Sequence, residues 1–202
     1  MKFPLFASFI VFIIWLTYQL HKHDRIDEAT KQSFWEKERR ANSTRRKPLD
    51  DLPYIKIPYE SLHMNLLPGD EKADDYKEIF RSLSESQIVN FTGITNTDLK
   101  LQYGAPNIDL LTRYDQNFTV LVRTLHQWAS YLYEKAYVRE AREILELAVS
   151  VRTDVSGSYK LLCQIYKEEN TPEKIKELYP TAESLNSIMK NTIVRILQEA
   201  EQ

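Results

Sequence analysis

Apolar positions between residues 125 and 182 follow one pattern twice, at a spacing of 34 residues. The first copy comprises Leu125, Trp128, Ala129, Leu132, Leu145 and Ala148, and the second comprises Tyr159, Leu162, Cys163, Tyr166, Tyr179 and Ala182. Large and small apolar residues alternate in each copy as two packed antiparallel helices require, with a small residue where the helices cross closely. A period of this length predicts an array of helix pairs, whose usual work is to hold another protein.

The polar and apolar pattern predicts further helices on both sides of this region. A helix over residues 70–83 places Tyr76, Ile79, Phe80 and Leu83 on one face. We expect a short helix capped by Asn96 or Thr97 to end at Gly104, and another to run from Pro106 to Leu111. None of these segments keeps the 34-residue spacing, so we interpret them as an N-terminal cap of the array. A capping helix over 187–200 would present Ile188, Ile193, Ile196 and Leu197.

An uncharged and almost wholly apolar run occupies Phe3 to Leu20. As a helix it would measure about 27 Å at about 1.5 Å per residue, close to the thickness of the hydrocarbon layer. A cleaved signal peptide would need small residues at a cleavage site after the run, and Tyr-Gln-Leu-His-Lys-His stands there instead. The run therefore predicts a single transmembrane anchor over residues 3–20.

Basic residues concentrate directly after this run. Residues 21–47 hold nine Lys and Arg against five Asp and Glu. The positive-inside rule then predicts a protein of the cell membrane, with its N-terminus outside and everything after residue 20 in the cytoplasm. Residues 21–47 would form a basic, helical stalk beneath the membrane.

A linker arm is predicted over residues 48–69. Pro53 and Pro58 disfavour helix, and Tyr54, Ile55 and Ile57 favour an extended chain. These apolar side chains need a partner, which leaves three interpretations: an arm packed on the helical domain, a docking peptide, or an autoinhibitory strand in the domain's own groove. The sequence does not choose among them.

Composition narrows the range of functions. The chain has 202 residues, 43% of them hydrophobic, with four glycines and a net charge of −2. Residues 70–202 hold sixteen basic and twenty-one acidic residues, so we expect no nucleic-acid partner. Cys163, the one cysteine, rules out an internal disulfide. The chain has no G-x-S-x-G, no phosphate-binding glycine loop, no H-E-x-x-H and no C-x-x-C, so we expect no enzyme activity, cofactor, metal site or small-molecule substrate.

From Asp115 onward the pattern resembles the tetratricopeptide repeat family. Ala141 aligns with the family's small residue of helix B, and Thr171-Pro172-Glu173 makes a good helix start. The resemblance implies an all-α domain over 70–202, a helix-hairpin solenoid with repeats at about 122–153 and 156–187. Ala136 departs from the family's turn glycine, and Pro180 should kink or break the second helix B. The whole chain is also similar to membrane-anchored bacterial proteins with the same order of anchor, stalk and helical domain.

The resemblance further implies a concave partner-binding groove lined by helix A residues. These residues are Arg123, His126, Ser130, Tyr133, Lys160, Gln164, Lys167 and, from the last helix, Arg195. Their cations would bind a carboxylate or an acidic segment of an unknown protein or peptide; ordinary solvated charge is the alternative. We therefore expect a membrane-tethered adaptor without catalytic activity. The alternative function is a self-associating or accessory structural subunit of a larger membrane complex.

Overall fold

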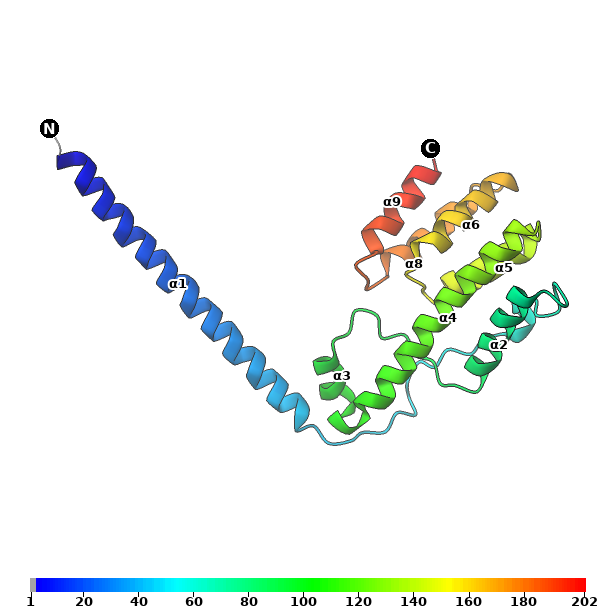
Figure 1. Ribbon diagram of the computed structural model, residues 1–202, viewed down its shortest axis with the longest axis horizontal. Coiled ribbons are helices and arrows are strands. Elements are labelled where there is room, and N and C mark those ends of the chain that lie inside the picture. The colour runs from blue at the N-terminus through cyan, green and yellow to red at the C-terminus, as the bar shows by residue number, and fades with distance from the viewer. Residues whose placement is uncertain (1–2) are drawn as a thin grey trace. The chain divides into compact units, whose positions relative to one another are not determined.

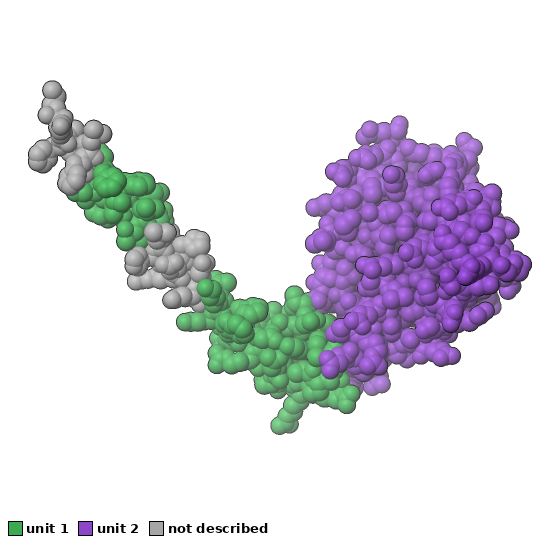
Figure 2. Space-filling model, viewed as in Figure 1, with its two compact units in different colours: residues 1–47, 95–108 green, residues 48–94, 109–202 purple. Residues whose placement is uncertain are grey.

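The computed structural model describes residues 3–202, apart from the side chains of residues 3–7 and 20–29. Two compact units make up the chain, residues 1–47 with 95–108 (unit 1) and residues 48–94 with 109–202 (unit 2) (Figure 2). All regular structure in the described part is helical (Figure 1). The expectation of an all-α chain is confirmed at this level.

Unit 1 joins the end of α1 (Phe3–Asn42) to α3 (Asn96–Tyr103) and the short η2 (Ala105–Asn107). Ala41 of α1 is fully buried. Lys100 of α3 forms an ion pair with Glu38 at 2.6 Å, and Lys37 pairs with Asp98 at 2.7 Å. Thr95 caps α3 by accepting a hydrogen bond from the Asp98 amide, so the cap lies one residue before Asn96 and two before Thr97, the caps that we predicted.

The transmembrane anchor is a wrong prediction. No helix in the described part of the chain has a stretch both long and apolar enough to cross a bilayer. The side chains of residues 3–7 and of Leu20, which the prediction included, lie outside the description. The same finding contradicts the predicted single-pass topology, the membrane as a partner and the cell-membrane localisation.

Unit 2 contains the remaining helices. They are η1 (Tyr59–Leu62), α2 (Glu71–Ser84), α4 (Ile108–Glu134, of which Ile108 belongs to unit 1), α5 (Val138–Ser150), α6 (Ser156–Glu168), α7 (Lys174–Glu177), α8 (Tyr179–Glu183) and α9 (Lys190–Ala200). Helix α5 packs on α6, and α9 packs on both α6 and α8 (Figure 1). Helix α4 runs through the positions where we expected a separate short helix after Pro106.

Residues of the 34-residue pattern form the core of unit 2. Eleven of the twelve pattern positions are buried, and Tyr179 is partly buried against the same cluster. Trp128 and Tyr159, two of the large aromatic side chains among them, have no exposed surface. Fully burying a side chain of this size stabilises the fold by about 1.5–3 kcal/mol. The alternation that is visible in the sequence therefore marks the residues that hold α4, α5 and α6 together.

Three helices of unit 2 end in the same backbone conformation. Ala136, Arg152 and Asn170 follow α4, α5 and α6 with φ of 66°, 61° and 57°. The amide of the next residue donates to a carbonyl five positions back in each case, for example Tyr137 to Leu132 at 2.9 Å. This is the Schellman termination, which usually places glycine in the left-handed position. Ala136 and Asn170 are 34 residues apart, so the helix ends keep the period too.

Pro180 breaks the second helical hairpin, as its ring predicts. The helix that begins near Pro172 ends at Glu177, and a new helix, α8, begins at Tyr179 with Pro180 in its first turn. A proline is tolerated there because the first helical amides lack intrahelical partners. The capping helix was expected over 187–200, but α9 begins only at Lys190. Ile188, expected on its apolar face, is 96% exposed ahead of the helix.

The arm, residues 52–60, packs on the helices of its own unit, unit 2. Ile55 and Ile57 lie against the core cluster, and residues 55–58 face Leu121, Leu125, Leu147 and Val151 of α4 and α5. The Ile55 amide donates to the Ile88 carbonyl at 2.9 Å, and the Tyr59 hydroxyl donates to the Phe80 carbonyl at 2.8 Å. Of the three interpretations, packing on the domain is the one that the structure shows.

Candidate functional site

Helices α6 and α9 form the walls of a groove with a volume of about 490 Å³. Lys160, Gln164 and Lys167 project from α6 at a spacing of four and then three residues, which places them on one side of a helix. Arg195 comes from α9, which packs directly against α6 (Figure 1). Four of the eight residues that we predicted for a binding groove therefore line the same opening.

The floor of the groove is apolar. Cys163, Ile196 and Ala200 line it between the charged residues. Cys163 is only 3% exposed, and burial raises the pKa of its thiol to about 11. A thiol with this pKa stays protonated at neutral pH and behaves as a small apolar group. The floor offers a partner a surface for hydrophobic contact.

Cations at the rim of the groove are available to a partner. Lys160 and Lys167 are exposed, and neither forms an ion pair with any residue that the structure describes. Arg195 lies 3.7 Å from Glu199 across one helical turn, and both side chains are more than two-thirds exposed. Exposed pairs of this kind contribute little energy, so Glu199 competes only weakly with an external carboxylate.

Tyr133 of α4 joins the groove through a hydrogen-bond network. Its hydroxyl donates to Glu168 Oε1 at 2.7 Å, and the Gln164 amide donates to the Tyr133 oxygen at 2.8 Å and to Glu168 at 3.0 Å. The Tyr133 and Gln164 bonds lower the pKa of the Glu168 carboxyl, and the Glu168 carboxylate raises the pKa of Tyr133. The network fixes Gln164, one of the polar groups that a bound segment would meet.

Four predicted residues do not line this groove: Tyr133, which only hydrogen-bonds to residues that do, and three others on α4. Arg123 is exposed on α4, and Ser130 is half-buried on the same helix. The His126 ring lies against Gly157 in the first turn of α6, where a methyl group on Gly157 would stand 2.8 Å from the ring. Burial lowers the pKa of His126 below its usual value. His126 thus packs two helices together where we expected a binding residue.

The sequence did not reveal the other half of the groove. Glu168, Thr192, Ile196, Glu199 and Ala200 also line it, and most of them belong to α9. The apolar spacing of Ile193 and Leu197 predicted a helix that packs by this face, and both residues are buried. That spacing did not indicate that the adjacent face of α9 would lie beside Lys160 and Lys167 of α6.

Other chemistry is not apparent in the part of the chain that the structure describes. No group of three or more His, Cys, Asp or Glu side chains is arranged there to hold a metal ion. The groove between α6 and α9 is the candidate site because it combines several predicted residues in one cavity.

Comparison with known proteins assigns no family. No protein-family model matches the chain, and no solved structure matches it. The chain is 24% identical over 203 residues to elongation factor G of Dehalococcoides mccartyi. The aligned region covers 94% of this chain but 28% of that protein, so the chain spans less than a third of its relative. This likeness places the chain in no family.

Proposed function

We propose that the chain is a protein-interaction adaptor without catalytic activity, and that the groove between α6 and α9 binds an acidic segment of another protein. The observation that carries this proposal is a pair of exposed cations, Lys160 and Lys167, which form no ion pair with any described residue and lie beside an apolar floor. Carboxylates bind such cations through charge-assisted hydrogen bonds, and the floor adds apolar contact.

Charge distribution supports a partner of this kind. Residues 70–202 carry an acidic surplus of five, so an acidic partner is repelled by most of that segment and attracted at the groove. Complementary charge of this type contributes to specificity and to the rate of association more than to affinity. We therefore expect binding that weakens as the salt concentration rises.

The tetratricopeptide-like architecture remains part of the proposal. The two hairpins would be the second half of α4 with α5, and α6 with α7 and α8. Burial of the 34-residue pattern and the recurrence of the left-handed helix ends at Ala136 and Asn170 support it. A third hairpin is not needed for the groove, because α9 supplies its second wall.

The test replaces Thr192, which lines the groove, by a photo-crosslinking amino acid. The chain is then irradiated in a native extract and the crosslinked partner is identified. The proposal expects the crosslinked partner peptide to be acidic, and expects Lys160→Glu/Lys167→Glu to abolish its capture. The matched control is Arg113→Glu/Lys176→Glu, which reverses two exposed charges outside the groove and should leave capture unchanged. Equal capture by the groove variant and the control would refute the proposal. Crosslinks only to other copies of the chain would favour self-association instead.

A further inference from the structure

The side-chain amide of Gln164 has only one orientation that its neighbours allow. Its nitrogen donates to the Tyr133 hydroxyl oxygen at 2.8 Å and to Glu168 Oε1 at 3.0 Å. The Tyr133 hydroxyl donates to the same Glu168 oxygen at 2.7 Å. An ionised carboxylate accepts hydrogen bonds and cannot donate them, so a reversed amide would bring two acceptor oxygens together. Glu168 therefore fixes which end of the amide is which.

The network uses both hydrogens of the Gln164 amide and leaves its oxygen free. Gln164 Oε1 accepts no hydrogen bond from any residue that the structure describes. The side chain is exposed and lines the groove between α6 and α9. Its nitrogen is turned toward Tyr133 of α4, which does not line the groove. The oxygen is therefore the atom of this amide that a bound segment can reach.

The groove thus presents an acceptor between two cations. Lys160 precedes Gln164 by four residues and Lys167 follows it by three, which is about 6 Å and about 4.5 Å along α6. Glu168 also lines the groove, and its bonds from Tyr133 and Gln164 lower the pKa of its carboxyl, so it carries a negative charge at neutral pH. A ligand carboxylate placed at this middle point would meet only oxygen atoms and negative charge, whereas an N–H group would be accepted.

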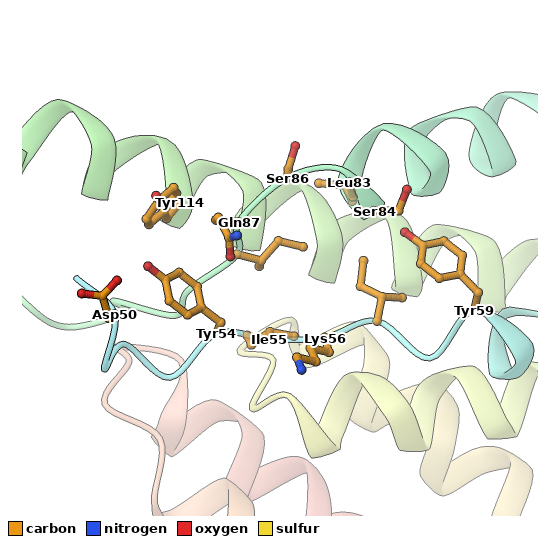
Figure 3. Close-up of a pocket in the computed structure, with 12 residues that line it drawn as sticks. Asp50, Tyr54, Ile55, Lys56, Tyr59, Leu83, Ser84, Ser86, Gln87 and Tyr114 are labelled. Carbon is orange, nitrogen blue, oxygen red and sulfur yellow. The ribbon is translucent and has the colours of Figure 1, made fainter. Parts of the chain in front are cut away.

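The larger cavity beside the arm, of about 590 Å³, uses its polar side chains differently (Figure 3). The Tyr54 hydroxyl donates to the Leu49 carbonyl at 2.9 Å, and the Tyr59 hydroxyl donates to the Phe80 carbonyl at 2.8 Å. These bonds hold the arm to the fold. In the groove between α6 and α9, by contrast, the bonds orient one polar atom, Gln164 Oε1, and leave it for a ligand.

We propose that the groove selects an acidic segment in which an amide side chain stands between two carboxylates, because Gln164 Oε1 accepts an N–H group and repels a further acid. This inference rests on the function proposed above and specifies the sequence pattern of the partner. In an extended segment every second side chain faces the same way, at intervals of about 6.6 Å. These intervals are close to the spacing along α6, and the long side chains of Lys160 and Lys167 cover the remainder. The pattern is therefore acid-x-amide-x-acid, with asparagine or glutamine at the centre.

The test compares two fluorescent, end-capped peptides in anisotropy titrations with the full chain. The first is Ser-Thr-Asp-Thr-Asn-Thr-Asp-Thr-Ser, and the second has aspartate in place of the asparagine. Attraction to the cations alone would favour the second peptide, which carries one more negative charge. The orientation of Gln164 reverses this order, and we expect the asparagine peptide to bind about three- to tenfold more tightly.

The two proposals fail by different results. Equal affinities, or tighter binding of the aspartate peptide, would overturn this inference and leave the proposed function in place. If neither peptide saturates by about 1 mM, or if Lys160→Glu/Lys167→Glu leaves binding unchanged, the proposed function is overturned and this inference with it.

Tyr133→Phe tests how Gln164 is positioned, without a change of charge. It removes the hydroxyl that holds one hydrogen of the Gln164 amide, so the amide can rotate and offer its nitrogen to a ligand. The preference for the asparagine peptide should fall below about twofold. Tyr137→Phe removes a hydroxyl four positions later, outside the network, and is the matched control that should keep the full preference. Gln164→Leu removes the acceptor itself and should abolish the preference. A full preference in Tyr133→Phe or Gln164→Leu, with urea unfolding as in the unmodified chain, would overturn the inference.

Discussion

The indole nitrogen of Trp128 donates a hydrogen bond to the backbone carbonyl of Leu62 at 2.9 Å, across 66 residues of sequence. Both residues are fully buried. The indole ring also lies near Tyr76, with centroids 5.7 Å apart, so α4 is tied to both η1 and α2 at one residue. The segment after the arm is therefore fixed to the core by a bond that water does not reach.

Replacement of Trp128 tests the importance of this tie. Trp128→Ala should lower the free energy of unfolding by about 3–5 kcal/mol, because a large side chain leaves a cavity. Trp128→Phe keeps most of the packing but leaves the Leu62 carbonyl without its donor, which should cost at least about 1–3 kcal/mol. Urea unfolding followed by circular dichroism measures both. An unfolding transition of Trp128→Ala that coincides with that of the unmodified chain would contradict the assigned core.

Gly157 and His126 should show strong energetic coupling. An alanine at 157 would meet the His126 ring at 2.8 Å, a contact that side chains do not sustain. Gly157→Ala should therefore destabilise the chain, although alanine is favoured over glycine within helices by about 1 kcal/mol. In a His126→Ala background the same change should become stabilising. A double-mutant cycle on unfolding free energies measures the coupling, and additive effects would contradict the packing described here.

Ala136→Gly should stabilise unit 2. Ala136 has φ of 66°, a conformation that costs an alanine about 1–2 kcal/mol and a glycine almost nothing. The greater freedom of glycine in the unfolded chain offsets about 0.4–1 kcal/mol of this gain. We expect a net gain between about 0 and 1.6 kcal/mol, seen as a higher midpoint of urea unfolding. Glu134→Gly, two residues earlier and inside α4, is the control and should destabilise the chain.

Asp70 should make stability depend on pH in the acid range. Its carboxylate caps α2 through the Ala73 amide at 3.0 Å and accepts a hydrogen bond from the Tyr131 hydroxyl at 2.8 Å. The Ala73 bond, followed by the Tyr131 bond, lowers the pKa of Asp70 in the folded chain below its ordinary value of 3.8. The folded state thus releases the proton more readily than the unfolded state. The resulting stabilisation is complete above the unfolded pKa and is lost as the pH falls through the folded one.

The measurement is urea unfolding of the chain and of Asp70→Asn at a series of acid pH values. The difference in unfolding free energy between them should shrink as the pH is lowered below about 4. Asp75, which is exposed on α2, provides Asp75→Asn as the control, whose difference from the unmodified chain should not follow this course. If the difference in unfolding free energy between Asp70→Asn and the unmodified chain does not change with pH, the Asp70 carboxylate does not stabilise the fold in the way proposed.

The sequence predicted the parts of the fold that depend on local periodicity. The face of α2 that carries Phe80 and Leu83, and the break at Pro180, follow from helical spacing and from proline's missing amide. The arm's packing was one of three open choices because an apolar extended segment needs a partner, but its sequence does not say which one. The membrane anchor was predicted from the apolar composition of residues 3–20, but no helix in the described part of the chain is both long and apolar enough to cross a bilayer.

Only half of the candidate site could be predicted from the sequence. Lys160, Gln164 and Lys167 share one helix, so their spacing places them together. Arg195 and Glu199 reach the same groove only because α9 folds back over Cys163 and packs on α6. The packing of His126 could not be predicted, because Gly157, against which its ring lies, comes 31 positions later, in another helix. Contacts between distant segments depend on packing angles that a periodic pattern does not specify.

The tie between Trp128 and Leu62 also bears on the order in which unit 2 assembles. Helices α5 and α6 are neighbours in sequence, and α9 reaches α6 across only the short helices α7 and α8. Contacts that close short stretches of chain form more quickly than distant ones. Seating the Leu62 carbonyl on the indole closes a loop of 66 residues, whose entropy cost grows as the logarithm of length and amounts to about 4 kcal/mol. The C-terminal helices should therefore fold first, and the arm should dock last, onto a surface that is already formed.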